Sequence, residues 1–259
     1  MKARVKRTLA VIVLLLCSAL LVYLDKETEK WQHPLACTGI KVRILDSVNT
    51  GFVSASEIKA IIAGETGPWL GLKPDSVKLW KIEEVLEAKP VILSVEAYLN
   101  GLTLNVDVRQ RTPVVRFNSE TGAFYADGEG FIFPVKEGFD PDVPVVEGSI
   151  PVSEIKGNFY GTVQDKEGRA WVRKIIGLAA YISGTRPWKN LVGKIVPDPD
   201  GGLTIIPLKG EEKFIFGAPV DIEKKFKKIE KYYQYIAKAD EGKVYRTVDV
   251  SFRKQIICR

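Results

Sequence analysis

The feature that most constrains this chain is an uncharged apolar run near its N-terminus. Residues 8–24 read TLAVIVLLLCSALLVYL, in which polar side-chain groups come from Thr8, Ser18 and Tyr23. A helix of roughly 17–25 such residues crosses a bilayer core of about 30 Å. It can do so because a helix satisfies every backbone polar group within the segment. The sequence therefore predicts a transmembrane helix at residues 8–24.

The charges around this run predict its orientation. Residues 1–7 carry four basic side chains and no acidic one, which places the N-terminus in the cytoplasm by the positive-inside rule. A polar linker at residues 25–36 would then lead to folded domains on the far side of an inner membrane. A cleaved signal peptide would end in an A-x-A-like site, which is absent. A lipoprotein modified at Cys17 is disfavoured by the bulky Leu16, and a buried core helix by the basic flank.

Charge and cysteine content exclude several classes of function. The net charge is +6, but beyond residue 24 the chain carries 34 basic and 32 acidic side chains, too even a balance to indicate nucleic-acid binding. His33 is the single histidine, which argues against His-based metal sites and catalytic triads. Cys37 and Cys258 could form a disulfide in an oxidising compartment, or act as small buried hydrophobes.

Residues 37–111 show the order strand, helix, helix, strand, strand. A period-two pattern at 40–44 predicts the first strand. Ser54 and Glu57 form a capping box for the first helix, and Asp75 is expected to cap the second. Asn100-Gly101 predicts a hairpin turn between strands at 92–99 and 102–109. Alternation in the last strand puts apolar side chains on one face and leaves the other, with Thr103, Asn105, Asp107 and Arg109, open to solvent.

Residues 112–259 predict a second, mixed α/β domain with an antiparallel-rich sheet, so that the fold class is α+β. No path is predicted for 136–166. The predicted helices span 167–183 and 221–238, and the predicted strands span 114–117, 124–126, 131–135, 192–196, 203–206, 213–216 and 244–257.

No catalytic motif accompanies these elements. The sequence lacks a G-x-S-x-G elbow, a phosphate-binding G-x-x-x-x-G-K-[ST] loop and a G-x-G-x-x-G turn after a strand. Glu83, Glu84 and Glu87 lie on the polar side of a helix, where solvation is their usual role, and Asp127 lies in a turn that favours aspartate for backbone reasons. We therefore expect no enzyme activity, no catalytic residue, no cofactor and no metal.

Short motifs follow in a fixed order along both domains. They are Arg111-Thr112-Pro113-Val114-Val115-Arg116, Tyr125-Ala126-Asp127, Gly130-Phe131-Ile132-Phe133-Pro134, Phe216-Gly217 and Val248-Asp249-Val250 with Ile256-Ile257. The unit at 37–111 resembles a POTRA domain. With these motifs behind it, essentially the whole chain resembles the bacterial cell-division family FtsQ/DivIB. Gln110 departs from the acidic residue that this family often has there, and 136–166 does not align.

The resemblance implies a divisome scaffold at the septum with its domains in the periplasm. Such proteins recruit and regulate septal peptidoglycan synthesis through small bitopic partners of the FtsB and FtsL type, without catalysis. Alternatives are an envelope assembly or binding module that carries a POTRA domain, which usually has tandem POTRA units, and a cell-wall hydrolase, which would need a catalytic carboxylate pair or metal triad.

The last predicted strand carries the expected partner site. If it lies at a sheet edge, its backbone groups form a template for a partner strand, as the resemblance implies for FtsB; otherwise it is an ordinary sheet strand. The lysines of helix 221–238 are expected to lie away from its apolar stripe, where they could attract an acidic segment or form a solvated face; they are Lys224, Lys225, Lys227, Lys228 and Lys231. The expected partner-binding residues are Tyr245, Thr247, Val248, Asp249, Val250, Ser251 and Phe252, with Tyr232 and Tyr235, which could instead cover the sheet.

Overall fold

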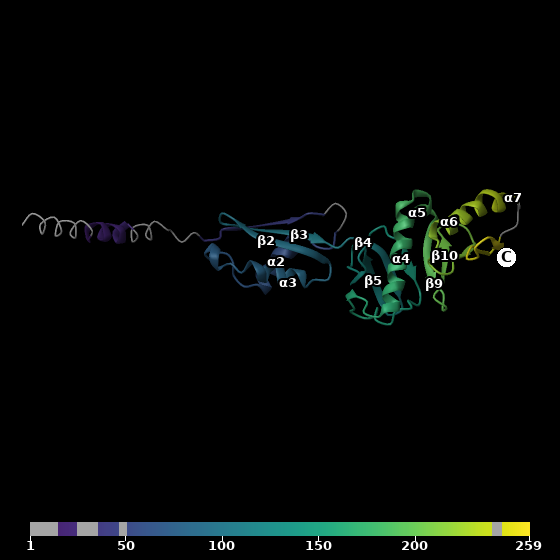
Figure 1. Ribbon diagram of the computed structural model, residues 1–259, viewed down its shortest axis with the longest axis horizontal. Coiled ribbons are helices and arrows are strands. Elements are labelled where there is room, and N and C mark those ends of the chain that lie inside the picture. The colour runs from purple at the N-terminus through teal and green to yellow at the C-terminus, as the bar shows by residue number, and fades with distance from the viewer. Residues whose placement is uncertain (1–14, 25–35, 47–50, 240–244) are drawn as a thin grey trace, which may run out of the picture.

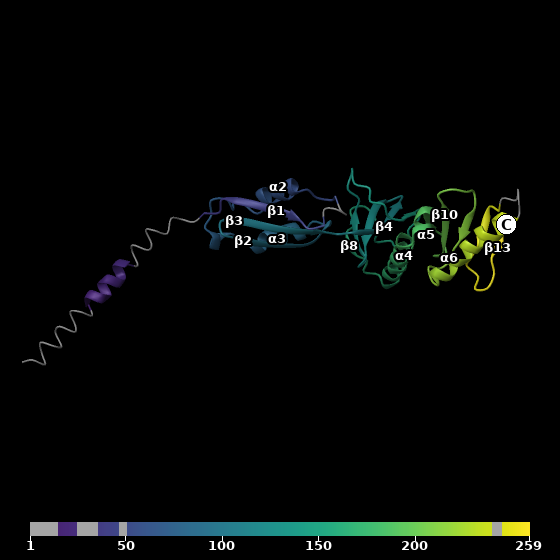
Figure 2. The ribbon, with the colours of Figure 1, turned by 90° about the horizontal axis from the view of Figure 1, so that it is seen from above.

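The computed structural model describes residues 15–24, 36–46, 51–239 and 245–259. Two sheets follow one another along the long axis of the molecule (Figures 1 and 2). A three-stranded sheet in the order β1-β3-β2 forms what we call the N-terminal domain. A ten-stranded sheet forms the C-terminal domain.

The predicted membrane helix is described only in part. Residues 15–24 are helical with exposed side chains, whereas residues 8–14 and most of the linker at 25–36 lie outside the described residues. Among the helices that are described, none has both the length and the apolar character needed to span a bilayer.

The N-terminal domain has the predicted β-α-α-β-β order. β1 runs parallel to β3, and β2 and β3 form an antiparallel hairpin. The two helices pack on this sheet and bury Ile58, Ile62, Ile82 and Leu86 against it. The elements are β1 (Gly39–Ile44), α2 (Ala55–Glu65), the short helix η1 (Pro74–Ser76), α3 (Leu79–Glu87), β2 (Ile92–Asn100) and β3 (Thr103–Gln110).

Local signals in this domain have mixed outcomes. The capping box is confirmed: the Glu57 N–H donates to Ser54 Oγ at 3.2 Å, and the Ser54 N–H donates to Glu57 Oε2 at 2.7 Å. The hairpin is also present, with Asn100 paired to Thr103. The prediction for Asp75 is wrong: it lies in η1, and α3 begins four residues later at Leu79, after Lys78, without a side-chain cap.

The predicted solvent face of β3 is also wrong for its central residues. Asn105 and Asp107 are both buried, because β3 is the middle strand and the side chains of its neighbours cover it. The Asp107 carboxylate accepts two hydrogen bonds from the Arg43 guanidinium on β1, one of them from Nε at 2.7 Å. These bonds lower the pKa of Asp107 and hold its charge in the covered face.

The C-terminal domain is built on one mixed sheet in the order β13-β12-β11-β10-β9-β7-β4-β5-β6-β8. Most neighbours are antiparallel, but β4 with β7, β7 with β9, and β11 with β12 are parallel. The first strands are β4 (Pro113–Ser119), β5 (Gly122–Asp127), β6 (Phe131–Pro134), β7 (Val145–Glu147) and β8 (Gly161–Thr162). The later strands are β9 (Val192–Pro197), β10 (Leu203–Pro207), β11 (Lys213–Ile215), β12 (Thr247–Asp249) and β13 (Ile257–Cys258).

Helices cover this sheet and close its core. α4 packs on β4, and aromatic contacts join Phe226 of α6 to Trp188 of α5, Tyr181 of α4 and Phe216 after β11. The sequence predicted α4 and α6 but missed the short α5, β7 and β8. The helices are α4 (Lys166–Gly184), α5 (Arg186–Leu191), α6 (Ile222–Lys231), the π-helical segment η2 (Tyr232–Ile236) and α7 (Ala237–Ala239).

An aromatic cluster joins the two domains. Phe52, from the N-terminal domain, is fully buried against Tyr125 and Phe133 of the second sheet and against Phe139. Lys136 follows β6 and reaches back to the first domain, where its ammonium donates to the Phe52 carbonyl at 2.6 Å and to Glu57 Oε1 at 2.8 Å. Glu57, which completes the capping box of α2, therefore also takes part in the contact between the two domains.

A buried ion pair lies beside this cluster. Arg111, between β3 and β4, donates from Nη1 to Asp127 Oδ2 at 2.7 Å, and its Nε donates to the Pro90 carbonyl at 3.1 Å. Its guanidinium carbon lies 3.5 Å from the centre of the Phe131 ring. The other oxygen of Asp127 accepts the backbone N–H groups of Glu129 and Phe131. Asp127 thus stabilises its turn and the domain joint together.

Candidate interaction site

The C-terminal end of the sheet differs from the predicted long strand at 244–257, and that prediction is wrong. After β12 the chain reverses through residues 250–256 and returns as β13. The Thr247 N–H donates to the Arg259 carbonyl at 3.0 Å, and the Arg259 N–H donates to the Thr247 carbonyl at 2.9 Å. The last residues of the chain therefore form the outermost strand of the described sheet.

This arrangement corrects the expected partner strand. β12 pairs in parallel with β11 on one side and antiparallel with β13 on the other, so it offers no sheet edge. Val248 and Val250 are fully buried in the core and cannot touch a partner. Thr247 and Asp249 lie within the doubly paired strand, and Ser251 donates its N–H and hydroxyl to Asp249 Oδ1.

The turn after β11 depends on a glycine that the sequence motif contains. Gly217 has φ +63°, and an added Cβ would lie 3.0 Å from the Cβ of Ser251. Its carbonyl accepts the Leu203 N–H at 3.0 Å. A glycine is required here because the chain takes a left-handed conformation while it lies against the segment that follows β12.

Four aromatic residues were expected at the interface, and the structure divides them. Tyr232 is buried and packs edge-on against Phe214 of β11, and Tyr245 is half-buried against the core. In contrast, Tyr235 is 68% exposed and Phe252 is 45% exposed. Tyr235 lies in the π-helical segment, a distortion common at functional sites. Two of the four are therefore available to a partner.

The lysines of α6 were expected to lie away from its apolar stripe, and for Lys225 this is wrong. Its side chain is 6% exposed, and its ammonium donates to the carbonyls of Phe216 at 2.8 Å and Ala218 at 2.6 Å. Burial lowers the pKa of Lys225. Lys228 also turns inward, and donates to the carbonyls of Val250 at 3.0 Å and Phe252. These two lysines fasten α6 to the chain segments beside it.

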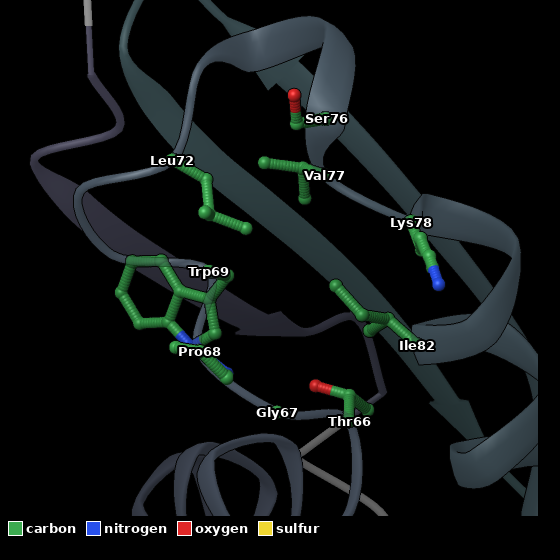
Figure 3. A pocket seen from close by; sticks show the side chains of 9 residues that line it. All are labelled: Thr66, Gly67, Pro68, Trp69, Leu72, Ser76, Val77, Lys78 and Ile82. Atoms are coloured by element: carbon green, nitrogen blue, oxygen red, sulfur yellow. The ribbon is translucent and has the colours of Figure 1, made fainter.

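A separate apolar hollow lies in the N-terminal domain, between the end of α2 and the start of α3. Figure 3 shows Leu72, Val77 and Ile82 around it, with Trp69 at one side. The hollow measures about 270 Å³. Lys78 is the one charged residue in its lining, so it lacks a pair of acid and base groups. Its chemistry suits an apolar side chain rather than a reaction.

The cysteines and acidic residues are the side chains that could support metal or disulfide chemistry. Among the residues that the structure describes, no group of three His, Cys, Asp or Glu side chains could hold a metal ion. Cys17, Cys37 and Cys258, all among the described residues, form no disulfide. Cys37 is buried in the core of the N-terminal domain, while Cys258 is on β13. Of the two alternatives drawn from the sequence, the structure therefore favours the buried hydrophobe for Cys37 over a disulfide with Cys258.

Comparison with known families covers both domains. A model described as POTRA-like domain matches residues 35–109. A model described as FtsQ/DivIB, C-terminal related, matches residues 112–259, more than half of the chain. The chain belongs to the FtsQ/DivIB C-terminal related family. The POTRA-like match covers the β-α-α-β-β unit, and the FtsQ/DivIB match covers the ten-stranded sheet, including its end at β13.

One curated relative of this FtsQ/DivIB chain is a cell division protein FtsQ of Rhodothermus marinus. It is 27% identical over 168 residues, which cover 61% of this chain and 56% of the relative. The chain thus aligns with just over half the length of that protein. Three of the motifs that indicated the FtsQ/DivIB family from sequence meet in the structure at the domain joint, where Arg111, Asp127 and Phe131 contact one another.

Proposed function

We propose that this chain is a single-pass membrane scaffold of the bacterial division machinery, with its two domains in the periplasm at the septum. FtsQ/DivIB membership supports a role in cell division. The apolar run at 8–24 and the basic residues before it support the anchor and its orientation. The scaffold carries out no reaction and acts through protein contacts.

The observation that carries this proposal is the position of β13. It ends the sheet order, and alternate backbone groups of an end strand point away from the sheet, where they can pair with a strand of another chain. The partner strand is therefore expected to add to β13 and not to β12. Natural sheets protect their edges with short strands and charges. β13 has both features, because it is short and follows Arg253 and Lys254. These features oppose unspecific pairing at the edge and favour a partner strand that matches them.

The proposed partners are small bitopic division proteins of the FtsB and FtsL type, through which the scaffold regulates septal peptidoglycan synthesis. Exposed aromatic residues strengthen such contacts because they bury a large area at low conformational cost. Tyr235 and Phe252 are both exposed beside this end of the sheet, and we assign them to the partner surface. A partner strand on β13 would bring its side chains to the same end of the domain.

Depletion of the protein followed by microscopy tests this function. We expect filamentous cells without septa, and restoration of septa by the full-length chain. Co-purification with the full-length chain from the restored cells should recover an FtsB-type partner. Normal septation after depletion, together with failure of envelope protein assembly, would contradict the division role and favour a POTRA-bearing assembly module instead. Peptidoglycan cleavage by the purified chain above background would contradict a scaffold without enzyme activity.

A further inference from the structure

A second feature of the C-terminal end is a hollow between the start of α6 and the chain that follows β12. Both views place α6 and the C-terminal segment side by side (Figures 1 and 2). The hollow measures about 530 Å³. We call it the basic hollow, and its charged lining residues are Asp221, Lys224, Lys225, Lys228, Arg253 and Lys254.

The positive charge in the basic hollow is not balanced by its own carboxylates. Five basic side chains line it against one acidic residue, Asp221, whose Oδ1 already accepts from Lys224 at 2.8 Å. Lys225 and Lys228 bond to backbone carbonyls, which are dipoles without net charge. Asp249 also acts electrostatically on Lys225, but its Oδ1 accepts two hydrogen bonds from Ser251.

Lys225 is a buried charged residue in the lining of the basic hollow. An ammonium group that is removed from water without a paired carboxylate is energetically costly, and Lys225 is buried with two carbonyls as its hydrogen-bond partners. An anion in the basic hollow would offset this cost. α6 also begins here without a side-chain cap from Asp221, and the positive end of a helix favours anions.

We propose that the basic hollow binds acidic side chains of a polypeptide partner. The cationic groups are spread along α6 and along residues 253–254, which suits several carboxylates on one chain better than a single small anion. Phe252 and Val220 are exposed apolar residues in the lining, and they suit the apolar side chains of a peptide. Lys254 precedes β13 by three residues, which span about 10 Å when extended.

This inference rests on the proposed function in one respect: the acidic segment belongs to the protein whose strand adds to β13. A short peptide in which glutamate alternates with threonine, labelled with fluorescein, is the probe. Its binding to the full-length protein is measured by fluorescence polarisation, and a glutamine-threonine peptide is the control. We expect the glutamate peptide to bind about tenfold more tightly, as three or more exposed charge contacts of ordinary strength predict. Equal binding of the two peptides would overturn the proposal.

Two triple variants with the same net charge locate the site. Lys224→Gln/Arg253→Gln/Lys254→Gln neutralises the rim of the basic hollow and leaves Lys225 and Lys228 in place. Lys227→Gln/Lys231→Gln/Lys238→Gln neutralises exposed lysines elsewhere on the same helical segment. We expect the first variant to bind the glutamate peptide about tenfold more weakly than the wild-type protein, and the second to lose less than about twofold in affinity. Equal losses, or displacement of the peptide by an equal concentration of inorganic phosphate, would overturn the proposal.

The two proposals can fail separately. Suppose that a division partner co-purifies equally with the rim variant and the wild-type protein, and that the glutamate peptide binds no more tightly than the glutamine peptide. The proposal for the basic hollow is then wrong, while the scaffold function stands. If the peptide binds at the basic hollow but no division partner is captured by the wild-type protein, the hollow stands as an acidic-peptide site and the division role is wrong.

Discussion

The buried ion pair between Arg111 and Asp127 predicts that the domain joint is sensitive to the loss of Arg111. Arg111→Ala removes the 2.7 Å contact with Asp127, the bond to the Pro90 carbonyl and the stacking on Phe131. The two side chains are 12% and 8% exposed, so the substitution leaves a carboxylate that water barely reaches. The loss of one partner of a buried ion pair costs about 3–5 kcal/mol.

The structure places the expected loss at the lower end of this range. Asp127 keeps two backbone N–H donors after the substitution, and these continue to stabilise its charge. We therefore expect the free energy of unfolding to fall by about 3 kcal/mol. The matched control is Lys227→Ala, which removes an ion pair of the same 2.7 Å length with Glu223 on an exposed helix surface. Because both side chains are solvated, that change should cost far less than Arg111→Ala.

A second substitution tests the physical reason. Asp127→Asn in the Arg111→Ala background removes the stranded charge but keeps an acceptor for the turn, so the double variant should be more stable than Arg111→Ala by about 1–2 kcal/mol. The assay is urea unfolding of the full-length protein followed by tryptophan fluorescence. The reasoning is refuted if Arg111→Ala costs no more than Lys227→Ala, or if Asp127→Asn destabilises the Arg111→Ala variant further.

Three other predictions concern the joint and the partner surface. Phe52→Ala should lower the free energy of unfolding by about 3–5 kcal/mol because it empties a fully buried aromatic site; a thermal shift no larger than that of Lys227→Ala would contradict this. A hydrogen bond from Lys136 is the main cause that lowers the pKa of Glu57 to about 2. The ionised Glu57 carboxylate therefore contributes its full stabilisation of the folded state above the ordinary pKa of 4.5, and this contribution is lost as the pH falls toward 2. Urea unfolding should show this extra acid sensitivity in the wild-type protein and not in Glu57→Gln; parallel curves would refute it. Tyr235→Ala should weaken co-purification of the partner about tenfold. Tyr160→Ala should not, because Tyr160 is also well exposed, at 56%, but lies next to β8; equal effects would remove Tyr235 from the interface.

Sequence patterns predicted the elements whose signals are local. The capping box at Ser54 and Glu57 and the hairpin after Asn100 each depend on residues a few positions apart, and both are present. The helix expected at 167–183 is α4, because its apolar stripe is long and regular. In contrast, β7 is three residues long within a Pro-rich loop, where periodicity has too few positions to be read.

The candidate site could be predicted only in part, because its key contacts join distant segments. The alternation around Val248 does indicate a strand, but β12 covers Thr247–Asp249 and not the predicted 244–257. Alternation cannot show whether a strand has one neighbour or two, and no glycine or proline marks the reversal before β13. The sequence pattern of α6 does not predict that Lys225 is buried, because the carbonyls that accept from its ammonium, at Phe216 and Ala218, belong to the turn after β11.

Site-specific photo-crosslinking in dividing cells tests the docking strand most directly. A photoreactive residue at Gln255 or Arg259, both exposed beside β13, is compared with one at Thr162 on β8, the strand at the opposite end of the sheet order. The account predicts a crosslink to a small bitopic division protein from the first two positions and not from Thr162. A crosslink to that protein from Thr162, with none from Gln255 or Arg259, would contradict docking at β13.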